Sequence, residues 1–121
     1  MTTPEVRQMI RVAKRLRQAT GYLELGMTQH ALDSLEGLGD LGPFEGPADL
    51  LRGEALRIQC RFEDAAKSLR RAAKSFPAPH DKTAWLALSH CYRQVGDTDR
   101  AVQSLARARG AQPPKKKRKS S

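Results

Sequence analysis

The sequence is poor in aromatic residues, cysteine and histidine, and it contains no long apolar run. Aromatic residues make up 5% of the 121 residues, whereas Ala, Leu and Arg recur throughout. Because these residues lose little side-chain freedom in a helix, we expect an all-α protein without a sheet. No apolar segment is long enough for a signal-peptide core or a membrane span, so we expect a soluble, unsecreted, cytoplasmic chain.

The scarcity of reactive side chains argues against an enzyme. Cys60 and Cys91 are too few and too far apart for a disulfide framework or a C-x-x-C zinc site. His90 precedes Cys91 directly, but adjacent helix residues point about 100° apart and cannot share a proton productively. The three histidines are scattered, so no metal site can be specified and no cofactor is expected. Cys91 is therefore interpreted as a small packing residue.

Three segments of the sequence align with one another without internal gaps. Neighbouring copies are displaced by 34 and then 36 residues, which is the period of a helical hairpin repeat. The aligned positions of the first segment are Tyr22, Gly26, Ala31, Leu35 and Pro43. Those of the second are Leu56, Cys60, Ala65, Leu69 and Pro77, and those of the third are Tyr92, Gly96, Ala101, Leu105 and Pro113. The small residues Ala31, Ala65 and Ala101 are expected where the two helices of each hairpin cross closely.

The third segment carries a family resemblance in Trp85-x-x-Leu88, Tyr92, Ala101 and Leu105. It resembles the tetratricopeptide repeat, whose pattern is W-x-x-L-G-x-x-Y, then A-x-x-x-F, then P. The resemblance covers roughly residues 12–115 and implies a right-handed superhelical stack of three antiparallel helical hairpins. The expected repeats span about 12–45, 46–79 and 82–115, within a helical domain of residues 1–112 followed by a disordered basic tail at 113–121. The tryptophan is missing from the first two repeats, where Arg15 and Asp49 stand in its place.

Local signals predict the same helices. Thr3 can cap a helix from Pro4 to about Leu25, and the partner helix is expected over 28–38. Gly39, Gly42, Pro43, Gly46 and Pro47 indicate a turn before helices over 48–59 and 62–76. Asp81 is the expected N-cap of a helix through Val95, and the last helix begins at Thr98 and ends before Gly110 and Pro113. The apolar stripe expected on the first helix consists of Val6, Ile10, Ala13, Leu16 and Leu23.

The resemblance also implies a function, because this family exposes the inner surface of its first helices as a groove for a peptide or helix of a partner. We therefore expect a non-enzymatic protein-binding module that serves as an adaptor, a chaperone-like holder or an assembly factor. An ordinary solvated face would have the same composition. The implied groove residues are Leu16, Thr20, Leu23, Glu24, Leu50, Glu54, Arg57, Leu86, His90 and Arg93.

A second surface is expected on the third hairpin. Nothing after its last helix can form a further covering helix, so Val102 and Leu105 are predicted to stay partly uncovered. Self-association would bury them. The sequence therefore predicts a homodimer formed through the third hairpin, unless another protein covers the patch or the patch is too small to matter.

The net charge of +9 is concentrated in two places. Five cations form the tail Lys115, Lys116, Lys117, Arg118 and Lys119. The tail resembles a nuclear localisation signal, which would place the protein in the nucleus of a eukaryote, and equally a polybasic anchor for nucleic acid or acidic lipid. It is also compatible with no role. The alternative function is thus a nucleic-acid-associated protein whose tail and Arg-rich first helix bind phosphate.

Overall fold

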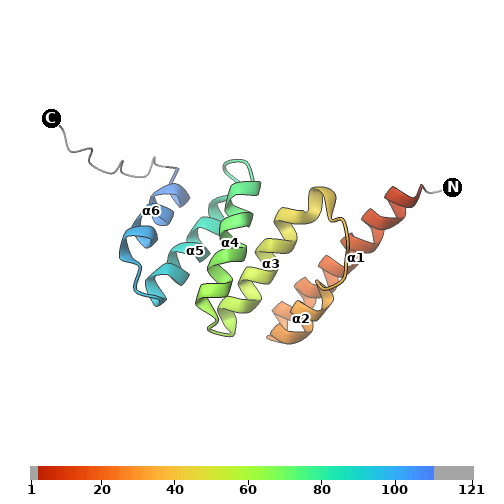
Figure 1. Cartoon of the computed structure of the whole chain (residues 1–121), viewed down its shortest axis with the longest axis horizontal. Coiled ribbons are helices and arrows are strands. Elements are labelled where there is room, and N and C mark those ends of the chain that lie inside the picture. Colours follow the sequence, from red (N-terminus) through yellow and green to blue (C-terminus); the bar gives the residue numbers. More distant parts are fainter. Residues whose placement is uncertain (1–2, 111–121) are drawn as a thin grey trace.

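The computed structural model describes residues 3–110, and this part of the chain is all-helical, as predicted (Figure 1). Residues 3–110 contain no β-strand. The elements are α1 (Pro4–Glu24), α2 (Thr28–Ser34), the short 3₁₀ helix η1 (Gly42–Phe44), α3 (Glu45–Ile58), α4 (Phe62–Ser75), α5 (Lys82–Gln94) and α6 (Thr98–Ala108). The third repeat's Pro113 and the basic tail lie outside the described residues.

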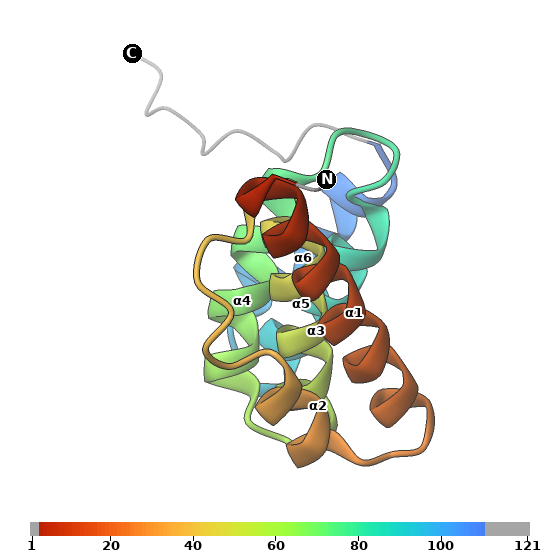
Figure 2. The ribbon, with the colours of Figure 1, turned by 90° about the vertical axis from the view of Figure 1, so that its right-hand side faces the viewer.

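The six helices form three hairpins, α1/α2, α3/α4 and α5/α6, stacked side by side in two layers. One layer holds α1, α3 and α5, and the other holds α2, α4 and α6; Figure 2 looks along the stack with α1 in front and α4 to its left. In the first layer α1 contacts α3 and α3 contacts α5, whereas the described parts of α2, α4 and α6 do not contact one another. The first layer is therefore the more closely spaced, inner side of the stack.

Small residues set the distance between the helices of each hairpin. Ala31, Ala65 and Ala101 are the fourth residues of α2, α4 and α6, and all three are buried. On the facing helix of the second hairpin, a Cβ added to Gly53 would lie 2.5 Å from Cδ2 of Leu69. Because close-packed interiors cannot accommodate such an overlap, side-chain size at these crossings fixes how near the helices approach.

The turns inside the three hairpins share one geometry. Gly26, Cys60 and Gly96 have φ values of 73°, 62° and 83°, all in the left-handed region. After each of them, a backbone N–H donates to the carbonyl of the aligned residue of the preceding helix, Tyr22, Leu56 or Tyr92, at 2.8, 2.9 and 2.8 Å. This six-residue hydrogen bond is the usual closure of a helix that ends in a left-handed residue. The structure thus repeats the register found in the sequence.

Neighbouring hairpins meet through a row of residues on the first helix of the later hairpin. In α3 this row is Ala48, Leu51 and Ala55, which pack with residues of α2, and in α5 it is Ala84, Ala87 and Cys91, which pack with residues of α4. The aligned row of α1 is Lys14, Arg17 and Gly21. Lys14 and Arg17 are exposed, so the α1 edge of the stack is polar.

The second helix is shorter than predicted. It ends at Ser34 instead of Leu38, because the chain then tightens into i→i+3 hydrogen bonds and turns at Gly37, which has φ 64°. The side-chain amide of Gln8 on α1 donates to the carbonyls of Leu38 and Asp40, which holds this segment in a non-helical path.

The third helix begins earlier than predicted. Gly46 and Pro47, expected in the turn, lie in the first turn of α3, which starts at Glu45. Proline is tolerated there because the first backbone N–H groups of a helix have no intrahelical acceptor. Gly46 is buried, and a Cβ at this position would lie 3.1 Å from Cβ of Ser75. Gly46 therefore lies within α3, in close contact with the end of α4.

The stripe predicted for the first helix was partly wrong. The buried residues of α1 are Val12, Leu16 and Ala19, whereas Val6 and Ile10 are 45% and 55% exposed. Because α2 has only seven residues, it is too short to cover the whole of the 21-residue α1, whose start lies beside the short η1 instead.

The two predicted caps behave differently. Thr3 caps α1 as predicted, since its hydroxyl accepts from the backbone N–H of Val6 at 3.2 Å. Asp81 makes no such bond to α5; its carboxylate accepts from the indole N–H of Trp85 at 2.9 Å. Side-chain pairing thus replaces the expected helix cap.

Candidate functional site

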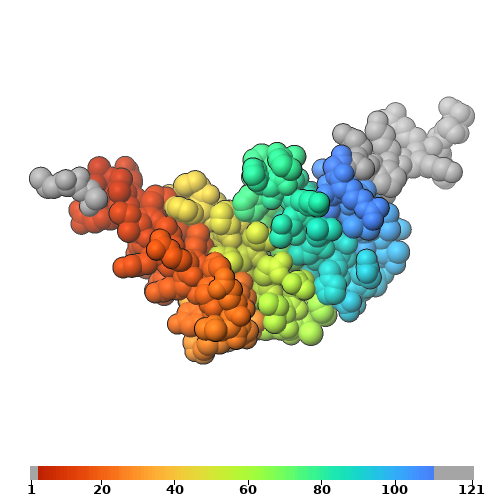
Figure 3. Space-filling view, turned by 180° about the vertical axis from the view of Figure 1, so that it is seen from behind, coloured from red at the N-terminus to blue at the C-terminus, as the bar shows by residue number. Residues whose placement is uncertain are grey.

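The inner layer presents the residues that the family resemblance implies for a groove, and they differ widely in exposure. Leu86 of α5 is 43% exposed, Leu50 of α3 and Leu23 of α1 are half-buried, and Leu16 is buried in the core with Val12. Among the polar positions, Thr20, Glu24 and Arg93 are exposed. Figure 3 shows the face on which α1, α3 and α5 lie. Leu86 of α5 is therefore the most accessible of these leucines.

Charged groups lie at the centre of the same face. On α3, Arg57 donates to the carboxylate of Glu54 at 2.6 Å, and both side chains are less than one-third exposed. The Nε atom of Arg57 is buried without a hydrogen-bond acceptor among the described residues. On α5, the ring of His90 lies edge-on to Phe62 with 5.8 Å between centroids. The face thus combines apolar contacts with one partly desolvated ion pair.

Cys91 lies beneath this face and is inert at neutral pH. Burial raises the pKa of its thiol to about 11; the charge of Arg57 opposes this shift, and that of Glu54 adds a smaller increase. A thiol is nucleophilic only as the thiolate, so this cysteine lacks the lowered pKa of a catalytic one. Its neighbour His90 contacts Phe62 instead.

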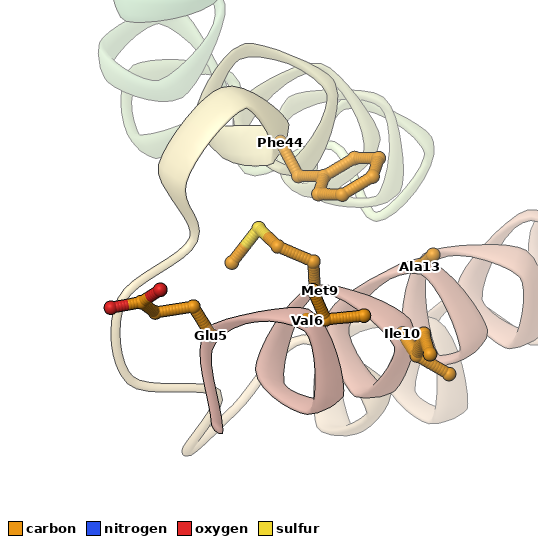
Figure 4. A pocket seen from close by; sticks show the side chains of 6 residues that line it. All are labelled: Glu5, Val6, Met9, Ile10, Ala13 and Phe44. Carbon is orange, nitrogen blue, oxygen red and sulfur yellow. The ribbon is translucent and has the colours of Figure 1, made fainter. Parts of the chain in front are cut away.

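A second hollow, not foreseen from the sequence, lies at the start of α1. It is an open, shallow depression of about 370 Å³ lined by Val6, Met9, Ile10, Ala13 and Phe44, with Glu5 at the rim (Figure 4). The lining is almost wholly apolar. The sequence predicted a long first helix with Val6 and Ile10 in its apolar stripe, but the whole stripe was expected to pack in the core.

The edge formed by α6 carries the apolar residues predicted to stay uncovered. Val102 is 52% exposed and Leu105 is half-buried. The aligned residues of α4, Ala66 and Leu69, are buried against α5. The α6 edge is therefore the surface on which a further hairpin would pack.

Comparison with known protein families agrees with the geometry of the hairpins. The family model of the tetratricopeptide repeat matches residues 56–117, slightly more than half of the chain. The chain belongs to the tetratricopeptide repeat family. No curated protein gave a significant match. Although α1 and α2 precede the matched range, their hairpin has the same turn and the same buried alanine as the other two.

Membership of this family bears on what the surfaces can do. Tetratricopeptide repeats generally mediate protein–protein interactions and are generally non-enzymatic. Within residues 3–110, every helix is too short or too polar to cross a bilayer.

Proposed function

We propose that the inner surface of α1, α3 and α5 binds a peptide or helix of a partner protein, so that the chain acts as an adaptor, a chaperone-like holder or an assembly factor. The observation that supports this most directly is the 43% exposure of Leu86 on a face that also carries the half-buried Leu50. Exposed leucines flanked by charged residues suit the apolar side of an amphipathic segment. The proposed contact residues are Thr20, Leu23, Glu24, Leu50, Glu54, Arg57, Leu86, His90 and Arg93. Leu16, which the resemblance also implied, is buried in the core and is not among them.

A paired-variant pull-down tests this function. The intact protein is compared with the double variant Leu50→Asp, Leu86→Asp, and with Leu25→Asp as a control, because Leu25 is 73% exposed in the first hairpin turn. We expect partners recovered with the intact protein and the control to be lost from the double variant, since a buried unpaired carboxylate disfavours binding strongly. Equal recovery by all three proteins would move binding to another surface.

We further propose that the α6 edge mediates self-association. Val102, 52% exposed, would become buried against a second copy. Sedimentation should then detect a dimer at high micromolar concentration, and Val102→Asp should return it to a monomer. A monomer at that concentration for the unmodified chain would rule the dimer out.

The alternative of nucleic-acid binding rests on the cations at both ends of the sequence, Lys115, Lys116, Lys117, Arg118 and Lys119 in the tail and the arginines of α1. Salt titration separates it from protein binding. Affinity for arbitrary DNA that falls steeply with salt and disappears on deletion of residues 113–121 would favour the alternative.

A further inference from the structure

A cationic cleft lies between α4 and α6, on the layer opposite the proposed groove. These two helices do not contact one another in the described chain, and α5 forms the floor between them (Figure 1). The cleft encloses about 310 Å³. Its floor holds Trp85, Leu88 and Tyr92, and its walls hold Arg70 and Lys74 of α4 and Arg100 and Arg107 of α6.

The four cations are arranged as two pairs along α5. At one end, the guanidinium carbons of Arg70 and Arg100 each lie 5.8 Å from the ring centroid of Tyr92, and Nε of Arg70 donates to the tyrosine hydroxyl at 3.0 Å. At the other end, Arg107 lies 5.2 Å from the ring centroid of Trp85, and Lys74 lines the same cleft. Tyr92 follows Trp85 by seven positions in α5, so the two rings on which the pairs are centred lie about 10 Å apart along the helix.

The cleft has more positive charge than its carboxylates neutralise. Among the described residues, Arg70, Lys74 and Arg107 form no ion pair, while Arg100 lies 3.5 Å from Asp97. One further carboxylate, Asp81, bonds the indole of Trp85. Two of the four cations therefore lack a counter-charge even if both carboxylates are counted.

The preceding hairpin shows why this charge is left over. Asp49 of α3 is aligned with Trp85 of α5, and Arg71 of α4 is aligned with Arg107 of α6. In the second hairpin, buried Asp49 accepts from Arg71 at 3.3 Å and from Arg52 at 2.9 Å. In the third hairpin, Trp85 takes the place of Asp49, and Arg107 lies over the face of its indole ring. A cation–π contact leaves the guanidinium N–H donors available to an external anion.

We propose that the α4–α6 cleft binds an acidic segment of a partner protein, with carboxylates that reach both cation pairs. A polyproline II segment rises about 3.1 Å per residue with three residues per turn, so acidic side chains three residues apart lie on the same side of the segment, about 9 Å apart, close to the spacing of the two cation pairs. A lone phosphate cannot span it. Nucleic acid is disfavoured because single-stranded binding relies on open aromatic faces, whereas guanidinium groups occupy those of Trp85 and Tyr92. This site goes beyond the proposed function, since it lies on the other layer of the stack.

The test measures binding of a synthetic peptide with Glu at every third position to the full chain. Trp85 is the single tryptophan of the protein, so its fluorescence reports directly from the cleft. The cleft variant is Lys74→Glu, Arg107→Glu, and the matched control is Lys14→Glu, Arg17→Glu on α1, which changes the net charge equally. Circular dichroism melts verify folding, and Lys74→Gln, Arg107→Gln replaces the cleft variant if it does not fold.

We expect the cleft variant to lose about tenfold or more in affinity and the control to lose no more than about twofold, because only the former reverses charge at the contact. The basic tail is present in both proteins and cannot produce this difference. Equal losses would overturn the proposal by showing that net charge alone attracts the peptide. Tighter binding of a thymidine oligonucleotide of equal charge, with the same dependence on Lys74 and Arg107, would also overturn it. The single variant Leu86→Asp, at a residue that is 43% exposed, should bind the peptide normally, so failure of the inner-surface function remains distinguishable.

Discussion

The second and third hairpins have the same frame and different polar chemistry. Both cross at a buried alanine and close their turn with the same backbone hydrogen bond. At one aligned position, however, α3 carries Asp49 bound to two arginines, whereas α5 carries Trp85 beneath one arginine. Small residues and turn geometry thus determine the frame, and one position of that frame can carry either a carboxylate that pairs with arginines or an aromatic ring that leaves the arginine donors available.

The largest expected effect tests whether the two crossings are equally constrained. Ala65→Trp should abolish cooperative melting, because Ala65 lies in the middle of the stack and a large side chain would force α3 and α4 apart, at a cost above about 4 kcal/mol. Ala101→Trp should retain a transition at lower temperature, since α6 is an outer helix that can shift. Circular dichroism melts provide the comparison, and an unchanged melting temperature for Ala65→Trp would refute the assigned packing.

The α5 row that packs on α4 contains the ionisable Cys91, whereas the aligned residue in the α3 row is Ala55. The pH dependence of stability therefore tests the burial of the α5 row. Because burial raises the pKa of this thiol from 9.0 to about 11, the folded state favours the protonated form. The contribution of the protonated thiol to the free energy of unfolding is therefore complete below pH 9, and about 2 kcal/mol of stability is lost as the pH rises towards 11. Urea unfolding should show a steeper decline for the wild type than for Cys91→Ala over this range. Parallel declines would contradict the assigned burial.

The tight contact at Gly53 gives a smaller difference between the hairpins. Gly53→Ala should destabilise the fold by about 1–2 kcal/mol, since the clash with Leu69 outweighs the better helix propensity of alanine. The aligned residue of α5 is Ser89, and Ser89→Ala should change the free energy of unfolding by less than about 0.5 kcal/mol. Chemical denaturation of both variants measures the contrast, which a stabilised Gly53→Ala would reverse.

The smallest expected effect is a gain in stability. Cys60 adopts the left-handed conformation that Gly96 adopts in the third hairpin, and an L-residue pays a steric penalty there. Cys60→Gly should therefore raise the free energy of unfolding by about 0.5–1 kcal/mol, and Gly96→Ala should lower it by a similar amount. Thermal melts at neutral pH test both changes, and a destabilised Cys60→Gly would show that its side chain contributes to the turn.

The frame was predictable from sequence because small residues and glycines recur at a fixed spacing. At Gly26, Ala31 and the positions aligned with them, local steric requirements restrict the residue type, so the pattern can be recognised in a single sequence. The end of α2 could not be predicted in the same way, because it depends on the side chain of Gln8, which is distant in sequence. Asp81 could accept either from a backbone N–H of α5 or from the nearby indole of Trp85, and residue types alone do not decide between these donors.

The cationic cleft was missed because its walls come from two helices of different hairpins. Arg70 and Arg107 are far apart in sequence, and each alone is an ordinary surface arginine. A signal did exist in the repeat alignment, where Arg107 retains the place of Arg71 while Asp49 gives way to Trp85. Such unmatched substitutions between aligned repeats indicate where charge is no longer balanced within the chain.

The two ends of the stack differ: α1 presents a row with lysine and arginine, whereas α6 presents an apolar edge. The stack can therefore be extended more easily at one end than at the other. An additional hairpin grafted beyond α6 would find Val102 and Leu105 ready as a docking strip, whereas one grafted ahead of α1 would have to desolvate Lys14 and Arg17. Longer arrays built from this scaffold should therefore grow in one direction only.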